Sequence, residues 1–85
     1  MRGKCMTVCE AVAMRINELL KEKNITLYRL ERESCIWHGT MMRIMHGYNK
    51  NITLKTIMQI AAGFKIPLVE FLNSPTFSHE SLEIY

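Results

Sequence analysis

The sequence has no hydrophobic run that approaches the roughly 20 residues needed to span a bilayer, so we expect a soluble protein. It also lacks a serine-nucleophile motif and a glycine-rich phosphate loop, and its centre holds no carboxylate that would orient a histidine. These absences argue against an enzyme. What remains is an 85-residue chain with 48% hydrophobic and 22% charged residues, a composition typical of one small folded domain.

The cysteines, Cys5, Cys9 and Cys35, are odd in number, and the N-terminus lacks the apolar run of a secretory signal peptide. We therefore expect reduced thiols in the cytoplasm. Cys35 lies three residues before His38, which raises the question of a metal site. A closed zinc site needs about four converging ligands, and no fourth ligand is evident, so we predict neither a metal nor another cofactor.

Acidic residues are missing from the middle of the chain. Residues 34–69 contain no Asp or Glu, although Arg43, Lys50, Lys55 and Lys65 all lie there. The net charge of only +3 is thus concentrated in a window that would meet a phosphate backbone without repulsion. The alternative is a chance gap in the acidic residues of a slightly basic protein.

Hydrophobic residues at three- and four-residue steps predict a first helix over residues 8–23, which Asn24 ends. Thr26 is placed to cap a second helix over residues 27–34. A third helix is predicted over residues 38–46, after a connection of only a few residues. Such a short connection requires a tight corner, and the pair of helices has the form of a helix-turn-helix.

Two more helices are predicted after Gly47, which is placed to end the third helix in a left-handed conformation. Thr53 caps the fourth helix, and Gly63 ends it. The buried side of the fourth helix is expected at Leu54, Ile57, Met58, Ile60 and Ala61. Pro67 opens a short fifth helix that runs through Leu72. The sequence therefore predicts an all-α fold of five helices.

The order and spacing of these segments resemble the lambda-repressor and Cro type of helix-turn-helix domain, also called the XRE family. The resemblance covers roughly residues 12–72 and includes a polar loop after Gly47. The other matching segments are LxxLERES, IxxGTMMRIMHG, LKTIMQIAAGF and IPLVEFL. It implies a transcriptional regulator, most simply a repressor, that binds double-stranded DNA as a homodimer.

The resemblance also implies site residues, because the third helix of this family lies in the major groove. Base contacts are expected from His38, Gly39, Met42 and Arg43. Arg43 is the best candidate for direct readout, since its guanidinium can bond bidentately to guanine, whereas Met42 could equally be a packing residue. Phosphate contacts are expected from Thr40, Tyr48, Asn49, Lys50, Thr53 and Lys55.

Three residues depart from the family pattern. Cys35 replaces the glycine usual at the corner, so either the corner is strained or its turn differs. Trp37 stands at a capping position that an indole cannot fill, and its ring is expected to cover the turn or, less favoured, to stack near the sugar-phosphate backbone. Gly39 offers no side chain to a base.

The domain is predicted to cover residues 1–72, leaving residues 73–85 as a tail with large apolar side chains. This tail could dock on its own core, join two subunits or bind a different protein. Contacts to a subunit or partner are expected from Phe71, Leu72, Phe77, Leu82, Ile84 and Tyr85. Binding a different protein leads to an alternative function, an interaction module such as an antitoxin that neutralises a toxin and represses its own operon.

Overall fold

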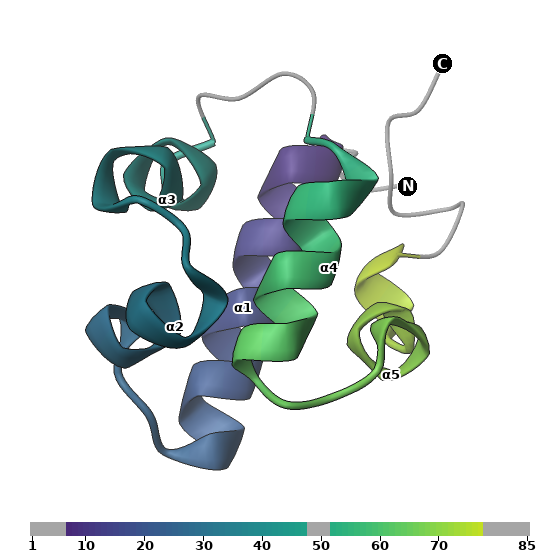
Figure 1. Cartoon of the computed structure of the whole chain (residues 1–85). Helices are drawn as coiled ribbons and strands as arrows, with labels where there is room; N and C mark the ends of the chain where they lie inside the picture. The colour runs from purple at the N-terminus through teal and green to yellow at the C-terminus, as the bar shows by residue number, and fades with distance from the viewer. Residues whose placement is uncertain (1–6, 48–51, 78–85) are drawn as a thin grey trace.

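The computed structural model describes residues 7–47 and 52–77 of the chain, and within these residues it is all helical (Figure 1). The elements are α1 (Val8–Lys23), α2 (Leu27–Ser34), α3 (His38–Met45), α4 (Leu54–Gly63), α5 (Leu68–Leu72) and a 3-10 turn, η1 (Pro75–Phe77). The predicted five-helix fold is confirmed. None of the described helices is long and apolar enough to cross a membrane.

Helix α1 has the predicted bounds, and side chains at its start explain why it begins there. The hydroxyl of Thr7 accepts a hydrogen bond from the Glu10 amide at 3.1 Å, and the Glu10 carboxylate accepts one from the Thr7 amide at 3.0 Å. This reciprocal capping box satisfies two amides that a helix start leaves free. Asn24 ends the helix, as predicted, and it does so in a left-handed conformation.

The corner between α2 and α3 keeps the geometry that a glycine usually supplies. Thr26 caps α2 by accepting a hydrogen bond from the Arg29 amide at 3.1 Å. Cys35 ends α2 at φ 59°, in the left-handed region, where a residue with a Cβ costs roughly 1–2 kcal/mol. Of the two possibilities left open for this corner, the strained one is confirmed. Trp37 precedes α3 and makes no side-chain capping bond, also as predicted.

Gly63 is the last residue of α4, as predicted, and it also has a role in packing. A Cβ at this position would lie 2.9 Å from the Cβ of Ser34 and 3.0 Å from Cδ1 of Leu30. The missing side chain therefore allows α4 to pack closely against α2. The left-handed residue after the helix is Lys65, at φ 62°.

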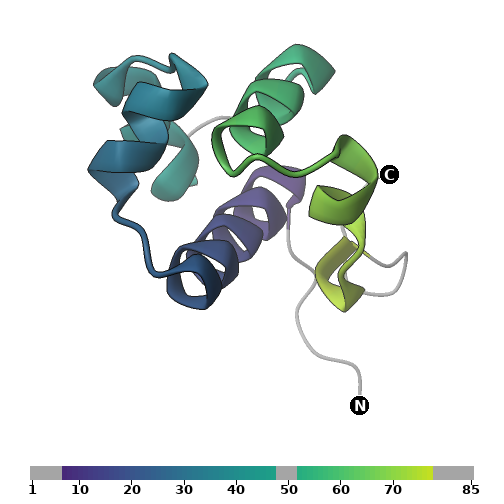
Figure 2. The same ribbon diagram turned by 60° about the horizontal axis from the view of Figure 1, so that its bottom comes forward.

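Three pairs of helices pack together around the core. Helix α1 packs against α3, and α4 packs against α2 and α5. Figures 1 and 2 both place α4 beside α1 at the centre, with α2 and α3 on one side and α5 on the other. Each of the five helices contributes fully buried side chains to this core, among them Val12, Ile16, Leu30, Met41, Ile44, Ile60 and Phe71. The arrangement leaves one side of α3 facing solvent.

Two predictions about apolar residues are wrong. Leu54 and Met58 are exposed, because the buried stripe of α4 runs through Ile57, Ile60 and Ala61 toward α2. Phe71, expected at a subunit or partner contact, has 0% of its surface exposed, since it fills the core.

The start of the expected tail packs on the domain. The ring of Phe77 is partly buried, with its centroid 6.0 Å from that of Phe71, and η1 lies against α1. The packed body thus extends past Leu72 to Phe77, which matches the docking on the domain's own core that was one possibility for the tail. The remaining tail residues named above, Leu82, Ile84 and Tyr85, lie outside the described residues.

Candidate nucleic-acid interface

Helix α3 has one face in the core and one in solvent. Met41 and Ile44 have no exposed surface and fix the helix to the body of the protein. Trp37, just before the helix, and His38 and Arg43 within it are exposed to solvent. Because the anchoring residues are apolar and the outer residues can donate hydrogen bonds, this helix has the division of roles that a groove-binding helix requires.

The side chain of His38, the first residue of α3, is bonded to α2. Its Nδ1 lies 2.8 Å from Oε2 of Glu31, a residue that is only 8% exposed. Residues 34–69 contain no carboxylate in the sequence, but the fold places the carboxylate of Glu31 against His38. Sequence reasoning missed Glu31. The available signal was its spacing on the helix: Glu31 directly follows Leu30 and precedes Ser34 by three residues, and both of these neighbours on the helix are buried.

Trp37 and Gly39 are in contact at the head of α3. A Cβ added to Gly39 would lie 2.6 Å from Cζ3 of the Trp37 ring. The indole thus rests on the first turn of α3, while 78% of the residue remains exposed. Trp37 occupies the space that a side chain at position 39 would take, so the exposed group at this point of the surface is the Trp37 ring.

The other expected contact residues of α3 differ in exposure. Arg43 is exposed, and Thr40 is half-buried. Met42 is also half-buried and packs against the core, which matches the packing role that was considered for it. Among the base-contact candidates, His38 and Arg43 are therefore the two with exposed polar side chains.

The start of α4 lies at the end of the connection that follows α3. Thr53 and Lys55 are exposed there, and the Thr53 hydroxyl accepts a hydrogen bond from the Thr56 amide at 3.2 Å. Tyr48, Asn49 and Lys50 belong to the connection and lie beyond the part of the chain that the structure describes.

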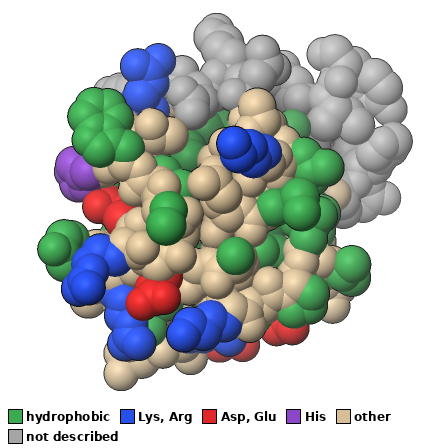
Figure 3. Space-filling view, viewed as in Figure 1, with side chains coloured by type: hydrophobic (Ala, Val, Ile, Leu, Met, Phe, Trp, Pro, Cys, Tyr) green, Lys and Arg blue, Asp and Glu red, His purple; other side chains and the backbone are tan. Residues whose placement is uncertain are grey.

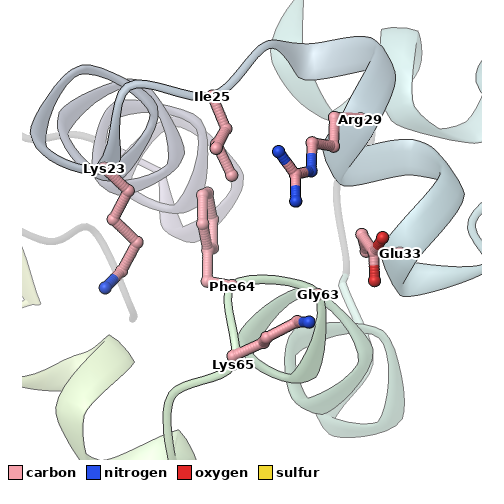
Figure 4. Close-up of a pocket in the computed structure, with 7 residues that line it drawn as sticks. All are labelled: Lys23, Ile25, Arg29, Glu33, Gly63, Phe64 and Lys65. Atoms are coloured by element: carbon pink, nitrogen blue, oxygen red, sulfur yellow. The ribbon is translucent and has the colours of Figure 1, made fainter.

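Lys65 is separated from Lys55 by the length of α4. Helix α4 has 10 residues and is about 15 Å long, and Lys65 follows its far end. There it lines a hollow of about 100 Å³ with Arg29 and Glu33, over Phe64 (Figure 4). This volume is well below the roughly 300–1,000 Å³ of typical small-molecule sites.

Apolar side chains gather over α4 and α5 in the view of Figure 3. Leu54 and Met58 are exposed one turn apart on α4, and Val69 and Leu72 are exposed on α5, which packs against α4. We call these four residues the α4–α5 surface. Exposed apolar groups in such a cluster are typical of a protein contact.

The described cysteines differ in their surroundings. Cys9 is buried and its thiol donates to the Ile44 carbonyl at 3.5 Å, whereas Cys35 is exposed. In residues 7–47 and 52–77, no three side chains of the metal-binding types come together.

A family model for the Cro/C1-type helix-turn-helix DNA-binding domain matches residues 15–75. The chain belongs to this family, so it is a helix-turn-helix DNA-binding protein of the kind that regulates transcription, and the resemblance is confirmed. Searches of curated proteins and of solved structures found no match.

Proposed function

We propose that this protein is a cytoplasmic transcriptional repressor that binds a specific DNA operator as a homodimer. The observation that carries the proposal is the division of α3, which is anchored by Met41 and Ile44 and exposes His38 and Arg43. Together with membership of a DNA-binding family, this division favours α3 as the helix that enters the major groove.

In this proposal the sequence is read by α3. Arg43 is exposed on the second turn and can bond both O6 and N7 of a guanine. His38 is exposed on the first turn and offers a ring nitrogen. Gly39 and Met42 contribute less than their positions in the family suggest, because Trp37 covers the first and the second packs on the core.

The phosphate contacts would set the register of α3 on the duplex. Thr53 and Lys55 suit this role because they are exposed on the first turn of α4, where the helix dipole also favours an anion. Thr40, with Tyr48, Asn49 and Lys50 from the connection before α4, completes the proposed set.

The α4–α5 surface supports the proposed homodimer. Its exposed apolar side chains lie on α4 and α5, whereas the DNA-reading residues lie on α3, so one subunit can use both surfaces at once. A dimer would place two copies of α3 about 34 Å apart, the repeat of the DNA major groove. Dimerisation also doubles the number of phosphate contacts and so strengthens binding.

The test is selection of bound sites from a random duplex pool with the full chain. We expect a palindrome whose half-sites are centred about 10 base pairs apart, or a multiple of this spacing. A pool that stays random after selection would contradict the proposal.

The α4–α5 surface also supports a second candidate function, a protein-interaction module such as an antitoxin. In that case the apolar side chains would contact a different protein, and DNA binding would serve autoregulation only. Salt-titrated binding to random duplex separates the two functions, because a repressor loses affinity steeply with salt. A flat salt response together with tight binding to a protein partner would favour the interaction module.

A further inference from the structure

The bond between Glu31 and His38 joins the two helices of the helix-turn-helix at the point where α3 begins. Oε2 of Glu31 lies 2.8 Å from Nδ1 of His38. The Glu31 side chain is 9% exposed and the His38 side chain 67% exposed. One partner is therefore held by the core, while the other reaches solvent on the side proposed to face DNA.

The chemistry of this contact assigns different roles to the two ring nitrogens. A carboxylate only accepts hydrogen bonds, so Nδ1 of His38 must carry the proton that it donates to Glu31. This leaves Nε2 as the ring nitrogen for other partners. In a neutral imidazole with a protonated Nδ1, Nε2 is an acceptor. The bond also restricts rotation of the ring, because moving Nδ1 away would leave the buried carboxylate without it.

We propose that Glu31 is a specificity-determining positioning residue, which holds His38 so that Nε2 accepts a hydrogen bond from one base of the operator. The inference rests on the proposed function of α3 as the groove-reading helix. In the major groove the amino groups of adenine and cytosine are the donors, whereas guanine and thymine present acceptors at the corresponding edge. His38 should therefore favour adenine or cytosine at its position.

An amide at position 31 would remove this restriction while keeping the shape of the side chain. A glutamine can accept from a protonated Nδ1 or donate to an unprotonated one. Either tautomer of His38 then fits, and Nε2 becomes an acceptor in one and a donor in the other. Glu31→Gln is thus expected to blur the base preference of His38 without abolishing DNA binding.

The experiment is a double-mutant cycle on base discrimination, measured at about pH 8, where an ordinary histidine is neutral. The operator recovered by selection is varied one base pair at a time. His38→Ala identifies the position that depends on His38. At that position Glu31→Gln should reduce discrimination about 2- to 10-fold, the range of one hydrogen bond, and leave the other positions unchanged. In the His38→Ala background the same change should have no effect on discrimination.

Glu33→Gln is the matched control, because it removes the same charge from an exposed site on α2. It should alter affinity for all duplexes alike and leave discrimination unchanged. The inference would be overturned if Glu31→Gln weakened every sequence equally, or if its effect persisted after removal of His38. A wild-type protein without any base preference would overturn the proposed function and this inference with it.

A second measurement needs no variant at position 31. Nitrogen-15 NMR of the histidine rings distinguishes their tautomers, and His38→Ala assigns the His38 signal among the three histidines of the chain. We expect a proton on Nδ1 in the free protein and a shift of the Nε2 signal on operator binding. A free protein with the proton on Nε2 alone would overturn the inference even if DNA binding is intact.

Discussion

The indole ring of Trp37 rests on Gly39, with Cζ3 only 2.6 Å from the place where a Cβ of residue 39 would lie. A glycine early in a helix costs up to about 1 kcal/mol relative to alanine. The contact explains why a glycine stands here, because any side chain at this position would displace the Trp37 ring from the first turn of α3. The head of α3 is thus shaped by an aromatic residue that precedes the helix.

Replacement of Gly39 tests this relationship. In the wild-type background Gly39→Ala should gain little stability, because the new Cβ must push the indole away. In a Trp37→Ala background the same change should stabilise the protein by up to about 1 kcal/mol, the helix propensity of alanine over glycine. Urea unfolding of the four proteins measures the difference, and equal gains in both backgrounds would show that the ring does not occupy the site.

Trp37 provides an internal probe, since it is the single tryptophan of the chain and is 78% exposed. If α3 enters the groove, duplex binding should change its emission and protect it from quenching by acrylamide. Titration with the selected operator measures both effects. Unchanged quenching at saturation would show that the head of α3 lies away from the DNA.

Replacement of Arg43 and replacement of Lys55 should have different effects on DNA binding. Arg43→Ala should cost about 1–3 kcal/mol of discrimination at one guanine, because a bidentate contact is lost. Lys55→Ala should weaken binding to all sequences alike and reduce the slope of log affinity against log salt by about 1 per subunit. Fluorescence anisotropy over a series of salt concentrations separates the two effects.

Lys65 is the control for these cations, because it lies in the hollow at the other end of α4 (Figure 4). Lys65→Asn suits the left-handed backbone at φ 62° and removes the same charge. Its salt slope should equal that of the wild type. If Lys65→Asn reduced the salt slope as much as Lys55→Ala does, the total positive charge of residues 34–69 would determine binding, and not the position of each cation.

Gly63 should be needed for the packing of α2 against α4. Gly63→Ala places a Cβ 2.9 Å from the Cβ of Ser34 and 3.1 Å from its backbone nitrogen, so the helices must separate. We expect a destabilisation of about 1–3 kcal/mol in urea unfolding, the usual effect of overpacking. Ala62→Ser, at the exposed neighbouring position, should cost less than about 1 kcal/mol. Equal effects of the two changes would contradict the packing role.

If the protein forms the proposed homodimer, the α4–α5 surface should hold its subunits together. Val69→Lys places a charge on this surface, and it should convert the proposed dimer into a monomer without loss of helix content. Light scattering after size-exclusion chromatography measures the mass. Tyr28→Lys, on α2 at a position that is 69% exposed against 78% for Val69, should leave the proposed dimer intact. A dimer that survives Val69→Lys would place the subunit contact elsewhere.

Local signals in the sequence were sufficient to predict the helices. Thr26 and Thr53 cap α2 and α4 as expected, and Asn24 ends α1. These features depend on residues within one or two turns of each other, so spacing alone reveals them. Burial was less predictable, because Leu54 and Met58 share the helical spacing of the core residues but are 59% and 52% exposed in the folded protein.

The sequence by itself determined five amphipathic helices, a tight corner at Cys35 and a concentration of cations in the centre of the chain. Tertiary structure alone decided that Glu31 bonds His38, that Phe71 fills the core and that Lys65 lies far from Lys55. The physical reason is that periodicity reports which face of a helix is apolar. Which residues meet across two helices depends on how closely and at what angle the helices pack, and this is set jointly by side chains distant in the sequence.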